Sequence, residues 1–494
     1  MARARRVDVD LGDGSPDADA RDGDGPEQRG PAGRRRWWLA VPVVAVLALV
    51  VGQVVTDTRE RTDLADLARQ PLVVDPVEGP VEVAWQVPRG TQIASAARAG
   101  SVLVAARVTP DLAVALEGVD VATGAGLWSS EVVAARPDLG EDAVADPVVC
   151  VPAPDDERQV ACLVPDSAWS VVDGAPVTVA ATTTRLLVLD AADGTVRVDR
   201  EVPTWAQWLT PVGDDVLLVG DLHGTLTAEL QALRDGATRW RTTSERKAGG
   251  PSSRVLPVTT VLDEETIAVD RLGEVVFLSA TNGEELGSVV SGLDVGGDGQ
   301  LVTFTATMSI ALGAALVFSD AGTQVATPGR AVSVEGVLPQ VLVDDGSVPG
   351  LVLTRTPRLT AWDADDGTER WATDVVDAED VTVFDGRVHV GTSTDLVTFD
   401  GATGDELWRF DRPSAEGTPV TDGRYLYTTA RRGERHSAPY DLVALHPADG
   451  SEAWRAPLPE RSWPQSVAGL LVATSFGPNI DDYEEIHQVL RGRG

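Results

Sequence analysis

The chain has 494 residues, a formal net charge of −35 at pH 7 and a single lysine, Lys247. Nucleic-acid binding needs clustered cations that displace counterions from the phosphates, so this charge balance excludes it. The 43% hydrophobic content gives material for a large core, and 48 Gly with 31 Pro favour many short strands and turns.

Residues 1–33 are rich in Gly, Asp, Pro and Arg and show no apolar periodicity. A segment of this composition cannot bury enough apolar surface to offset its loss of conformational entropy. It is predicted to be a disordered cytoplasmic tail. Its acidic and basic residues nearly cancel, so the tail indicates no particular partner.

A membrane anchor is predicted over residues 34–55. Three arginines at 34–36 precede two tryptophans and an apolar run that ends at Val55. Residues 37–55 are long enough to cross the hydrocarbon region as one helix, and the arginines indicate that the N-terminus is cytoplasmic. A cleaved signal peptide is the alternative, but its charged region would be unusually long and no small-x-small cleavage site follows. The sequence therefore predicts a single-pass signal anchor in the cell membrane, with the rest of the chain extracellular.

A stalk is predicted over residues 56–80. The charged stretch 57–69 is compatible with a short helix that Pro71 would end, and Pro76 and Pro80 favour an extended spacer beyond it. We expect this segment to separate the following domain from the lipid surface.

A ten-residue pattern recurs through the remainder: apolar, Asp, two variable residues, Thr or Asp, Gly, three variable residues and Trp. The closest copies are 119–128, 362–371, 399–408 and 445–454, the last with His446 in place of Asp. In such a turn the Asp side chain can bond backbone amides ahead of it, and Gly can adopt positive φ. The residues predicted to form the repeat are Asp120, Gly124, Trp128, Asp190, Gly194, Gly236, Trp240, Asp363, Gly367, Trp371, Asp400, Gly404, Trp408, Gly450 and Trp454.

The turn glycines, with weaker copies at Gly283 and Gly322 included, are 37 to 47 residues apart, apart from a 70-residue gap between Gly124 and Gly194. A period in the low forties with about four short strands per unit is typical of a β-propeller. The tryptophans are then expected to wedge between neighbouring sheets and bury a large area. These residues are therefore interpreted as structural, without a part in chemistry.

Ring closure is predicted from the two ends of this region. Val81–Val87 resembles the last strand of a blade whose earlier strands are missing, and 469–476 with 486–490 lack such a partner. Pairing them would close the ring and remove its edges. If each of the eight turn glycines marks a blade, the closing sheet would be a ninth. Because nine blades are implausible, we expect that either Gly283 or Gly322 does not mark a full blade. The predicted fold is all-β, an eight-bladed β-propeller over residues 81–494, with seven blades as the alternative.

Cys150 and Cys162 flank a loop rich in Pro and Asp. Outside the membrane this spacing predicts a disulfide that closes a hairpin, inserted within one blade by the 70-residue gap. Two buried thiols are the alternative. A zinc site would need two more soft ligands nearby, and the sequence offers none.

The repeat resembles the PQQ-type repeat from Val81 to the C-terminus. That family includes quinoprotein alcohol dehydrogenases and non-enzymatic propellers, among them the lipoprotein of the outer-membrane β-barrel assembly machine. The enzymes imply a quinone over the axis, a calcium ion and a disulfide between adjacent cysteines. Here the cysteines are not adjacent and no residue set matches. We therefore assign no catalytic, cofactor-binding or metal-binding residue, and expect no cofactor.

Other chemistry is not indicated either. The acidic stretch 363–367 lacks the Glu that would complete an EF-hand loop, so it is interpreted as a turn. No two of the five histidines have metal-ligand spacing, and no nucleophile elbow, phosphate-binding loop or kinase signature is present.

The sequence thus predicts a membrane-anchored, extracytoplasmic propeller that binds or scaffolds an envelope protein, peptide or glycan without catalysis. The alternative is an extracytoplasmic quinone-dependent oxidoreductase, which the family resemblance alone motivates.

Overall fold

The computed structural model describes Leu67, Gln70 and residues 72–493, with gaps at 140–142, 173–174, 223–224, 246–256, 271–273, 291–308, 312–313, 320–321, 328–329, 356, 413–417, 434–438 and 477–484. The chain divides into two compact units, 1–62 and 63–494, and all described residues belong to the second. The predicted tail and membrane anchor lie outside the described residues. Among those described, no helix has the length and apolarity needed to cross a membrane.

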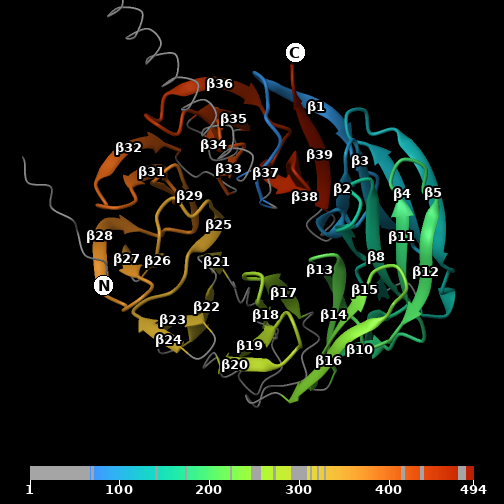
Figure 1. The fold of residues 1–494 in the computed structure, drawn as a ribbon. Helices are drawn as coiled ribbons and strands as arrows, with labels where there is room; N and C mark the ends of the chain where they lie inside the picture. The colour runs from blue at the N-terminus through green and yellow to red at the C-terminus, as the bar shows by residue number, and fades with distance from the viewer. Residues whose placement is uncertain are drawn as a thin grey trace, which may run out of the picture. The chain divides into compact units, whose positions relative to one another are not determined.

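The second unit is a ring of antiparallel sheets, each running from an inner to an outer strand (Figure 1). The first three sheets contain β2 (Ala97–Ala99), β3 (Val102–Val108), β4 (Val114–Asp120) and β5 (Gly126–Val133); β7 (Val149–Pro152), β8 (Gln159–Pro165), β11 (Thr184–Asp190) and β12 (Val196–Val202); and β13 (Trp208–Val212), β14 (Asp215–Leu222), β15 (Thr225–Ala232) and β16 (Thr238–Glu245). The next three contain β17 (Val258–Val261), β18 (Thr266–Asp270), β19 (Glu274–Ser279) and β20 (Glu285–Val290); β21 (Ser309–Ala311), β22 (Ala314–Ser319), β23 (Gly322–Thr327) and β24 (Arg330–Val334); and β26 (Leu351–Arg355), β27 (Arg358–Asp363) and β28 (Glu369–Val376). The last three contain β29 (Asp380–Phe384), β30 (Arg387–Gly391), β31 (Asp395–Asp400) and β32 (Glu406–Asp411), with β25 (Gln340–Asp344) added; β33 (Val420–Thr421), β34 (Leu426–Arg431), β35 (Tyr440–Leu445) and β36 (Glu452–Pro457); and β37 (Ser462–Val467), β38 (Leu470–Phe476), β39 (Glu485–Gly492) and β1 (Val81–Gln86).

The ring closes as the sequence predicts. β1, the first strand of the unit, pairs antiparallel with β39, the last, so that Val83 lies opposite Leu490. The closing sheet therefore takes three strands from the C-terminal end and its outer strand from the N-terminal end. This pairing removes the two free edges that an open ring would leave.

The expected number of eight blades is not confirmed. The described strands form ten sheets, of which one is an insertion, leaving nine in the ring with the closing sheet included. Gly283 lies in a complete four-stranded sheet, whereas Gly322 lies between β22 and β23 and not at the turn before an outer strand. The glycine pattern therefore misplaced that turn, although a sheet is present there.

One strand departs from the regular order. β25 pairs in parallel with β29 of the following sheet, with Gln340 opposite Asp380, and the sheet β26–β28 keeps three strands. The described sheet β26–β28 has no inner strand of its own. A single β-bridge between Val337 and Arg355 occupies that position beside β26.

The 70 residues between Gly124 and Gly194 do contain an insertion, but it is not the predicted hairpin that carries the two cysteines. Cys150 and Cys162 form a disulfide, as predicted, but they lie opposite each other on β7 and β8, the two inner strands of a regular sheet. The inserted element is a separate sheet of β6 (Val144–Ala145), β9 (Ala168–Val172) and β10 (Ala175–Val179), in the order β10-β9-β6. Because Pro and Asp between the cysteines resemble a long loop, the sequence did not distinguish a blade hairpin from an insertion.

The two faces of the ring differ. The turn face carries the turns between first and second strands and between third and fourth strands, including the repeat turns. The loop face carries the other connections, such as 87–96 and 109–113, and the 3-10 helices Ile93–Ser95 and Pro137–Leu139.

The described part of the predicted stalk is packed on the turn face, which corrects the expectation of a free spacer. We call Leu67, Gln70 and residues 72–80 the strap. Gln70 bonds both backbone groups of Asp344, Val74 N donates to Thr421 O at 2.9 Å, and Asp75 N donates to Gly469 O at 2.7 Å. Leu67, Val73, Val74 and Val77 are buried. Apolar residues spaced among the prolines and charges thus secure the segment to the blades.

The core lies between adjacent sheets. Residues 216–219 of β14 are all fully buried, because both faces of a middle strand are covered by neighbouring sheets. Outer strands instead alternate; in β28, Trp371 is 6% exposed and Val376 is 54% exposed. This alternation is the expected result of a strand with one face toward solvent.

Candidate functional site

The repeat turns have the geometry that the sequence predicts. Asp400 Oδ1 accepts hydrogen bonds from Thr403 N at 2.9 Å and from Ala402 N at 3.0 Å, and Gly404 has a φ of +75°. These hydrogen bonds, from Thr403 first, hold the pKa of Asp400 below its usual value. Asp120 makes the same contact with Thr123 N at 2.9 Å. The carboxylates are therefore used within their own turns.

Five tryptophans of outer strands each pin one sheet to the next. Trp371 Nε1 donates to Gly401 O at 3.0 Å, and a Cβ added to Gly404 would lie 2.6 Å from the Trp371 ring. The indole thus rests on the turn glycine of the following sheet and bonds the carbonyl just after its Asp. The same pattern joins the Trp85, Trp128, Trp240 and Trp408 indoles to the carbonyls of Val121, Ala191, Ala280 and Pro447, at 2.7 to 2.9 Å.

Besides Gly367, which Val332 covers in place of an indole, two described junctions depart from this pattern. Gly236 is covered by the guanidinium of Arg200, whose Nη1 donates to Gln231 Oε1 at 2.7 Å, while Nε and Nη2 are buried and have no hydrogen-bond partner among the described residues. Trp454 Nε1 also lacks a partner within the described residues. The closing sheet explains the second case, since β39 and β1 come from opposite ends of the chain and no repeat turn joins them.

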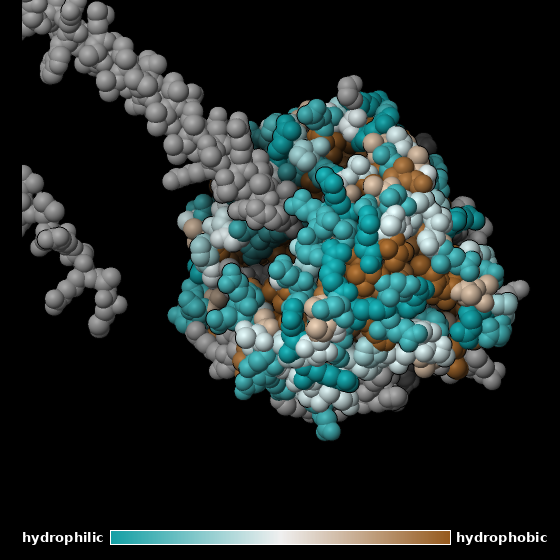
Figure 2. All heavy atoms as spheres, turned by 45° about the vertical axis from the view of Figure 1, so that its right-hand side comes forward, coloured by the Kyte–Doolittle hydropathy of each residue, from teal (hydrophilic) through white to brown (hydrophobic). Residues whose placement is uncertain are grey.

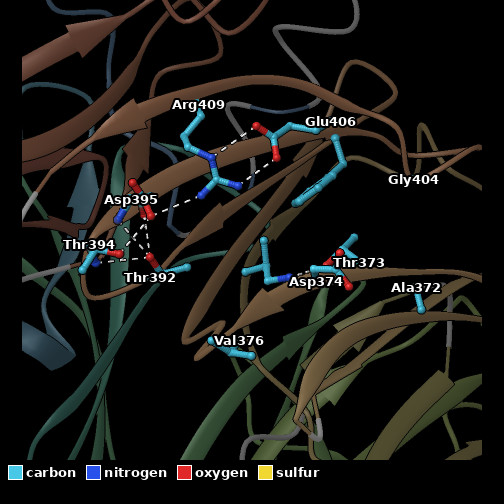
Figure 3. Close-up of a pocket in the computed structure, with 12 residues that line it drawn as sticks. Ala372, Thr373, Asp374, Val376, Thr392, Thr394, Asp395, Gly404, Glu406 and Arg409 are labelled. Atoms are coloured by element: carbon cyan, nitrogen blue, oxygen red, sulfur yellow. Dashed lines mark hydrogen bonds and ion pairs between the residues drawn. The ribbon is translucent and has the colours of Figure 1, made fainter.

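One cavity lies between β28 and the sheet β29–β32, with a volume of about 410 Å³ (Figure 3). Arg409 projects over it and pairs with Glu406 at 2.8 Å and Asp395 at 3.2 Å, as the dashed lines in Figure 3 show. Asp395 is held in turn by Thr394, whose Oγ1 lies 2.9 Å from its Oδ2. The charges at this cavity are therefore satisfied by one another.

A larger groove, of about 900 Å³, lies on the loop face. Three connections form it: residues 90–92 after β1, residues 108–112 between β3 and β4, and 136–137 with 143–145 before β7. Its exposed lining is mainly apolar. Arg136 N donates to Asp111 O at 2.7 Å and so ties two of these walls together. Figure 2 turns the side with β3, β5 and β12 forward, where hydrophobic residues gather between hydrophilic ones.

The inserted sheet borders this groove and adds exposed apolar residues. Val144 lies opposite Trp169 in the β6–β9 pair, and the two are 46% and 36% exposed. Directly opposed residues of an antiparallel pair point to the same face. Val144 also lines the groove, so its side chain joins the groove to the exposed face of the inserted sheet.

Asp111 and Arg136 line the groove, and two further carboxylates, Asp138 and Asp166, lie close to Arg136. The Thr109 hydroxyl lowers the pKa of Asp111, and the Arg136 side chain lowers that of Asp138. Burial alone would raise the pKa of Asp166, near β9, but hydrogen bonds from Thr182 and Thr183 hold it below its usual value. These carboxylates therefore stay ionised at neutral pH, and Arg136 is the cation paired with one of them.

A smaller cavity of about 220 Å³ adjoins the groove and shares Gly90 and Thr91 with it. His487 lines it and contacts Thr474 Oγ1 at 3.0 Å and Glu485 at 3.4 Å. Burial lowers the pKa of His487, with the Glu485 carboxylate opposing, so a neutral ring is favoured near neutral pH.

The candidate metal ligands and the histidines can be placed for the described residues. No group of three or more His, Cys, Asp or Glu side chains there is placed to hold a metal ion. His389 is buried beside Phe384 and Trp408, and His446 is exposed on a repeat turn. His223 and His436 lie outside the described residues.

Residues 334–481 match the family model described as outer membrane protein assembly factor BamB. That segment includes the repeats at Gly367, Gly404 and Gly450, whose turn and tryptophan geometry is described above. Over this segment the chain is similar to the PQQ-type repeat propellers. The resemblance inferred from the repeats is thereby confirmed.

Solved propellers resemble this propeller at low identity. BamB from Moraxella catarrhalis is 16% identical with a TM-score of 0.41, over 83% of this chain and 99% of that one. A europium-containing methanol dehydrogenase is 9% identical with a TM-score of 0.41, over 87% and 100%. Sqt1 of Saccharomyces cerevisiae is 9% identical with a TM-score of 0.40, over 85% and 98%. No curated protein matches the chain. These likenesses include binding proteins and enzymes and do not choose between them.

Sequence reasoning found the structural residues and missed the groove. Its walls come from three separate connections between residues 90 and 145. The one available signal was the 70-residue gap between Gly124 and Gly194, which marks an insertion on the loop face without revealing its strands.

Proposed function

We propose that this propeller is a non-catalytic binding module of the cell envelope, tethered to the cell membrane by residues 34–55. It binds a protein partner on its loop face, in the groove between 90–92, 108–112 and 143–145. The apolar groove beside the exposed Val144 and Trp169 is the observation that supports it. Concave, mainly apolar surfaces with a polar rim are typical of binding sites.

The strap supports the choice of face. It covers the turn face from Asp344 to Gly469, through backbone bonds and buried valines. The groove lies on the other face of the same unit. A partner that binds there leaves the strap undisturbed.

The arrangement of charges favours binding over catalysis. Asp111 and Asp138 at the rim are held ionised by Thr109 and Arg136, whereas a general acid needs a raised pKa. The quinone-dependent oxidoreductase has no particular feature of the described residues in its favour.

Site-specific photo-crosslinking tests this function. The full chain, expressed in its membrane, carries benzoylphenylalanine in place of Val144 or, as the matched control, Val196. These side chains are 46% and 45% exposed, and Val196 lies on β12 away from the groove. We expect one defined envelope protein to be joined at position 144 and not at 196.

Equal labelling at both positions, or none at 144, would contradict the proposed site. The same purified chain is also given quinone, calcium and a set of alcohols with a redox dye. Turnover above that of a chain-free control would favour the oxidoreductase and overturn the proposal of a non-catalytic module.

A further inference from the structure

We propose that the partner contributes an extended, cationic segment that pairs with β6 as a fourth strand of the inserted sheet. Alternate apolar side chains of this segment enter the loop-face groove, and its Lys or Arg side chains face the acidic rim. This inference rests on the proposed function and specifies how the same site recognises its partner.

β6 is an edge strand, and no other strand in the described part of the chain pairs with its second edge. The order β10-β9-β6 leaves it paired on one side only, with Val144 opposite Trp169 and Ala145 opposite Ala168. Asp146 N donates to Ser167 O at 3.0 Å, which continues the ladder. Successive residues of a strand direct their amides to opposite sides, so Ala143 and Ala145 point theirs away from β9.

That open edge faces the groove. Ala143, Val144 and Ala145 all line it, and no described strand pairs with β6 on that side. The Ala143 and Ala145 side chains are 8% and 9% exposed and belong to the core cluster around β3, β4 and β8, which fixes the strand. A rigid edge with unpaired amide and carbonyl groups is a ready template for strand addition.

Neither Pro nor Lys protects the edge. Proteins usually blunt exposed edges with these residues or with inward-pointing charges. Here the edge residues are Val144 and Ala145, and the opposed Trp169 extends an apolar surface beside them. The protection that remains is the shortness of β6, which has two residues and so limits strand addition to a short segment.

Charge complementarity selects the partner. The chain carries −35 overall, and the carboxylates of Asp111, Asp138 and Asp166 near the groove have lowered pKa values. Arg136 is already paired with Asp138. A cationic segment is therefore attracted to this face and an acidic one is repelled, with an effect that salt weakens. A second copy of this acidic chain is disfavoured for the same reason.

The probe is a fluorescent nine-residue peptide of alternating lysine and valine, titrated against the full chain in detergent and followed by anisotropy. A second peptide has glutamate in place of lysine. Two further peptides carry N-methyl groups on every lysine or on every valine, which removes the amide donors of one edge at a time. We expect the lysine peptide to bind at least tenfold more tightly than the glutamate peptide. Only one edge of the bound peptide pairs with β6. The peptide methylated on that edge should therefore bind at least tenfold more weakly, and the peptide methylated on the other edge should keep its affinity.

The protein variants test the same edge. Ala145→Pro removes the amide that faces the groove, at an edge position where proline is tolerated. Val144→Arg adds bulk and a repelling charge at an exposed position, and Val196→Arg is its matched control. We expect the first two variants to bind the lysine peptide at least tenfold more weakly, and the control within twofold of the unchanged chain. Val144→Arg keeps the test decisive if Ala145→Pro does not fold.

Three outcomes would overturn the inference: equal loss with both N-methylated peptides, unchanged binding to Ala145→Pro, or tighter binding of the glutamate peptide. Concentration-dependent self-association that Val144→Arg abolishes would instead make a second copy the occupant and also overturn it. If the envelope partner is still crosslinked at position 144 while the peptide results are negative, strand addition fails and the proposed function stands. If crosslinking at 144 also fails, the proposed function fails with it.

Discussion

Two junctions of the ring solve the same packing problem with different residues. Between β28 and β31–β32, Trp371 lies 6% exposed on Gly404 and donates to Gly401 O at 3.0 Å. Between β12 and β15–β16, the half-buried Arg200 covers Gly236 and satisfies only one of its three nitrogens, through Gln231. The first junction gains from a large apolar area and a satisfied indole, whereas the second buries polar groups at a cost.

The difference separates the structural part of this molecule from its functional part. The sheet β7–β8–β11–β12, whose outer strand places Arg200 where other junctions have a tryptophan, carries the disulfide between Cys150 and Cys162. Strands β9 and β10 of the inserted sheet lie in its connection between β8 and β11, and β6 lies in the connection from β5 to β7. The repeat turns and tryptophans therefore pin adjacent sheets, whereas the groove is formed by loop-face connections of the sheet β2–β5 and by β6, which lies between that sheet and the irregular one.

The largest effect is expected at the regular junction. Trp371→Ala leaves a cavity against Gly404 and removes the indole donor, and should cost about 3–5 kcal/mol of unfolding free energy. Urea unfolding followed by the remaining tryptophans measures it. The matched control, Trp169→Ala, replaces a 36% exposed ring and should cost less than about 1 kcal/mol. Equal costs would remove the distinction between the two regions.

The disulfide is expected to compensate in part for the missing tryptophan. Replacing Cys150 and Cys162 with alanine opens a loop of 12-residue separation, which should cost about 2–3 kcal/mol. A reducing agent should lower the stability of the unchanged chain by a similar amount and leave the double variant unaffected. A double variant as stable as the parent would show that this sheet needs no such support.

Acid should lower the free energy of unfolding through the buried His389 on β30. Burial, with a smaller effect of Arg387, lowers the pKa of His389 to about 3, against 6.5 for a free histidine. The unfolded chain then binds more protons between these values, so this contribution to stability falls as pH drops below 6.5. From pH 7.5 to pH 5 the loss is about 2 kcal/mol.

Denaturation at both pH values, with His389→Gln as the variant, checks the acid effect. The variant should lose about 2 kcal/mol less than the parent over this range. The exposed His446→Gln serves as control and should keep the parent's pH dependence. An unchanged pH dependence in His389→Gln would exclude the buried ring as its source.

The smallest effect is expected at the irregular junction. Glu229 already accepts from Gln231 Nε2 and Thr238 Oγ1, both within 2.7 Å, so it does not depend on Arg200. Arg200→Leu removes two buried unsatisfied nitrogens and should change stability by about 1 kcal/mol or less. A loss as large as that of Trp371→Ala would show that the arginine replaces the tryptophan in full.

Much of the fold follows from the sequence because the repeat is local. Asp400, Gly404 and Trp408 specify a turn and a wedge within nine residues, and the spacing of such copies predicts the ring. Closure by β1 also followed, since Val81–Gln86 and the last strands each lacked a partner. The disulfide was predictable from spacing and compartment.

The pairing of β25, the packing of the strap and the groove could not be predicted, because each depends on contacts between residues far apart in the sequence. Whether β25 pairs with β26 or with β29 is decided by neighbouring sheets, and both pairings suit its residues. The strap resembled a spacer because the apolar contacts of Leu67, Val73 and Val77 are made with distant strands. The groove was hidden for the same reason, as its walls meet only in the folded ring.

The central claim is that a partner is held on the loop face beside β6. Its most direct test is the affinity of the partner crosslinked at position 144 for two full-length variants, Val144→Arg and Val196→Arg, measured side by side. We predict that Val144→Arg weakens binding at least tenfold, about 1.4 kcal/mol, and that Val196→Arg stays within twofold. Equal affinities for the two variants would contradict the claim.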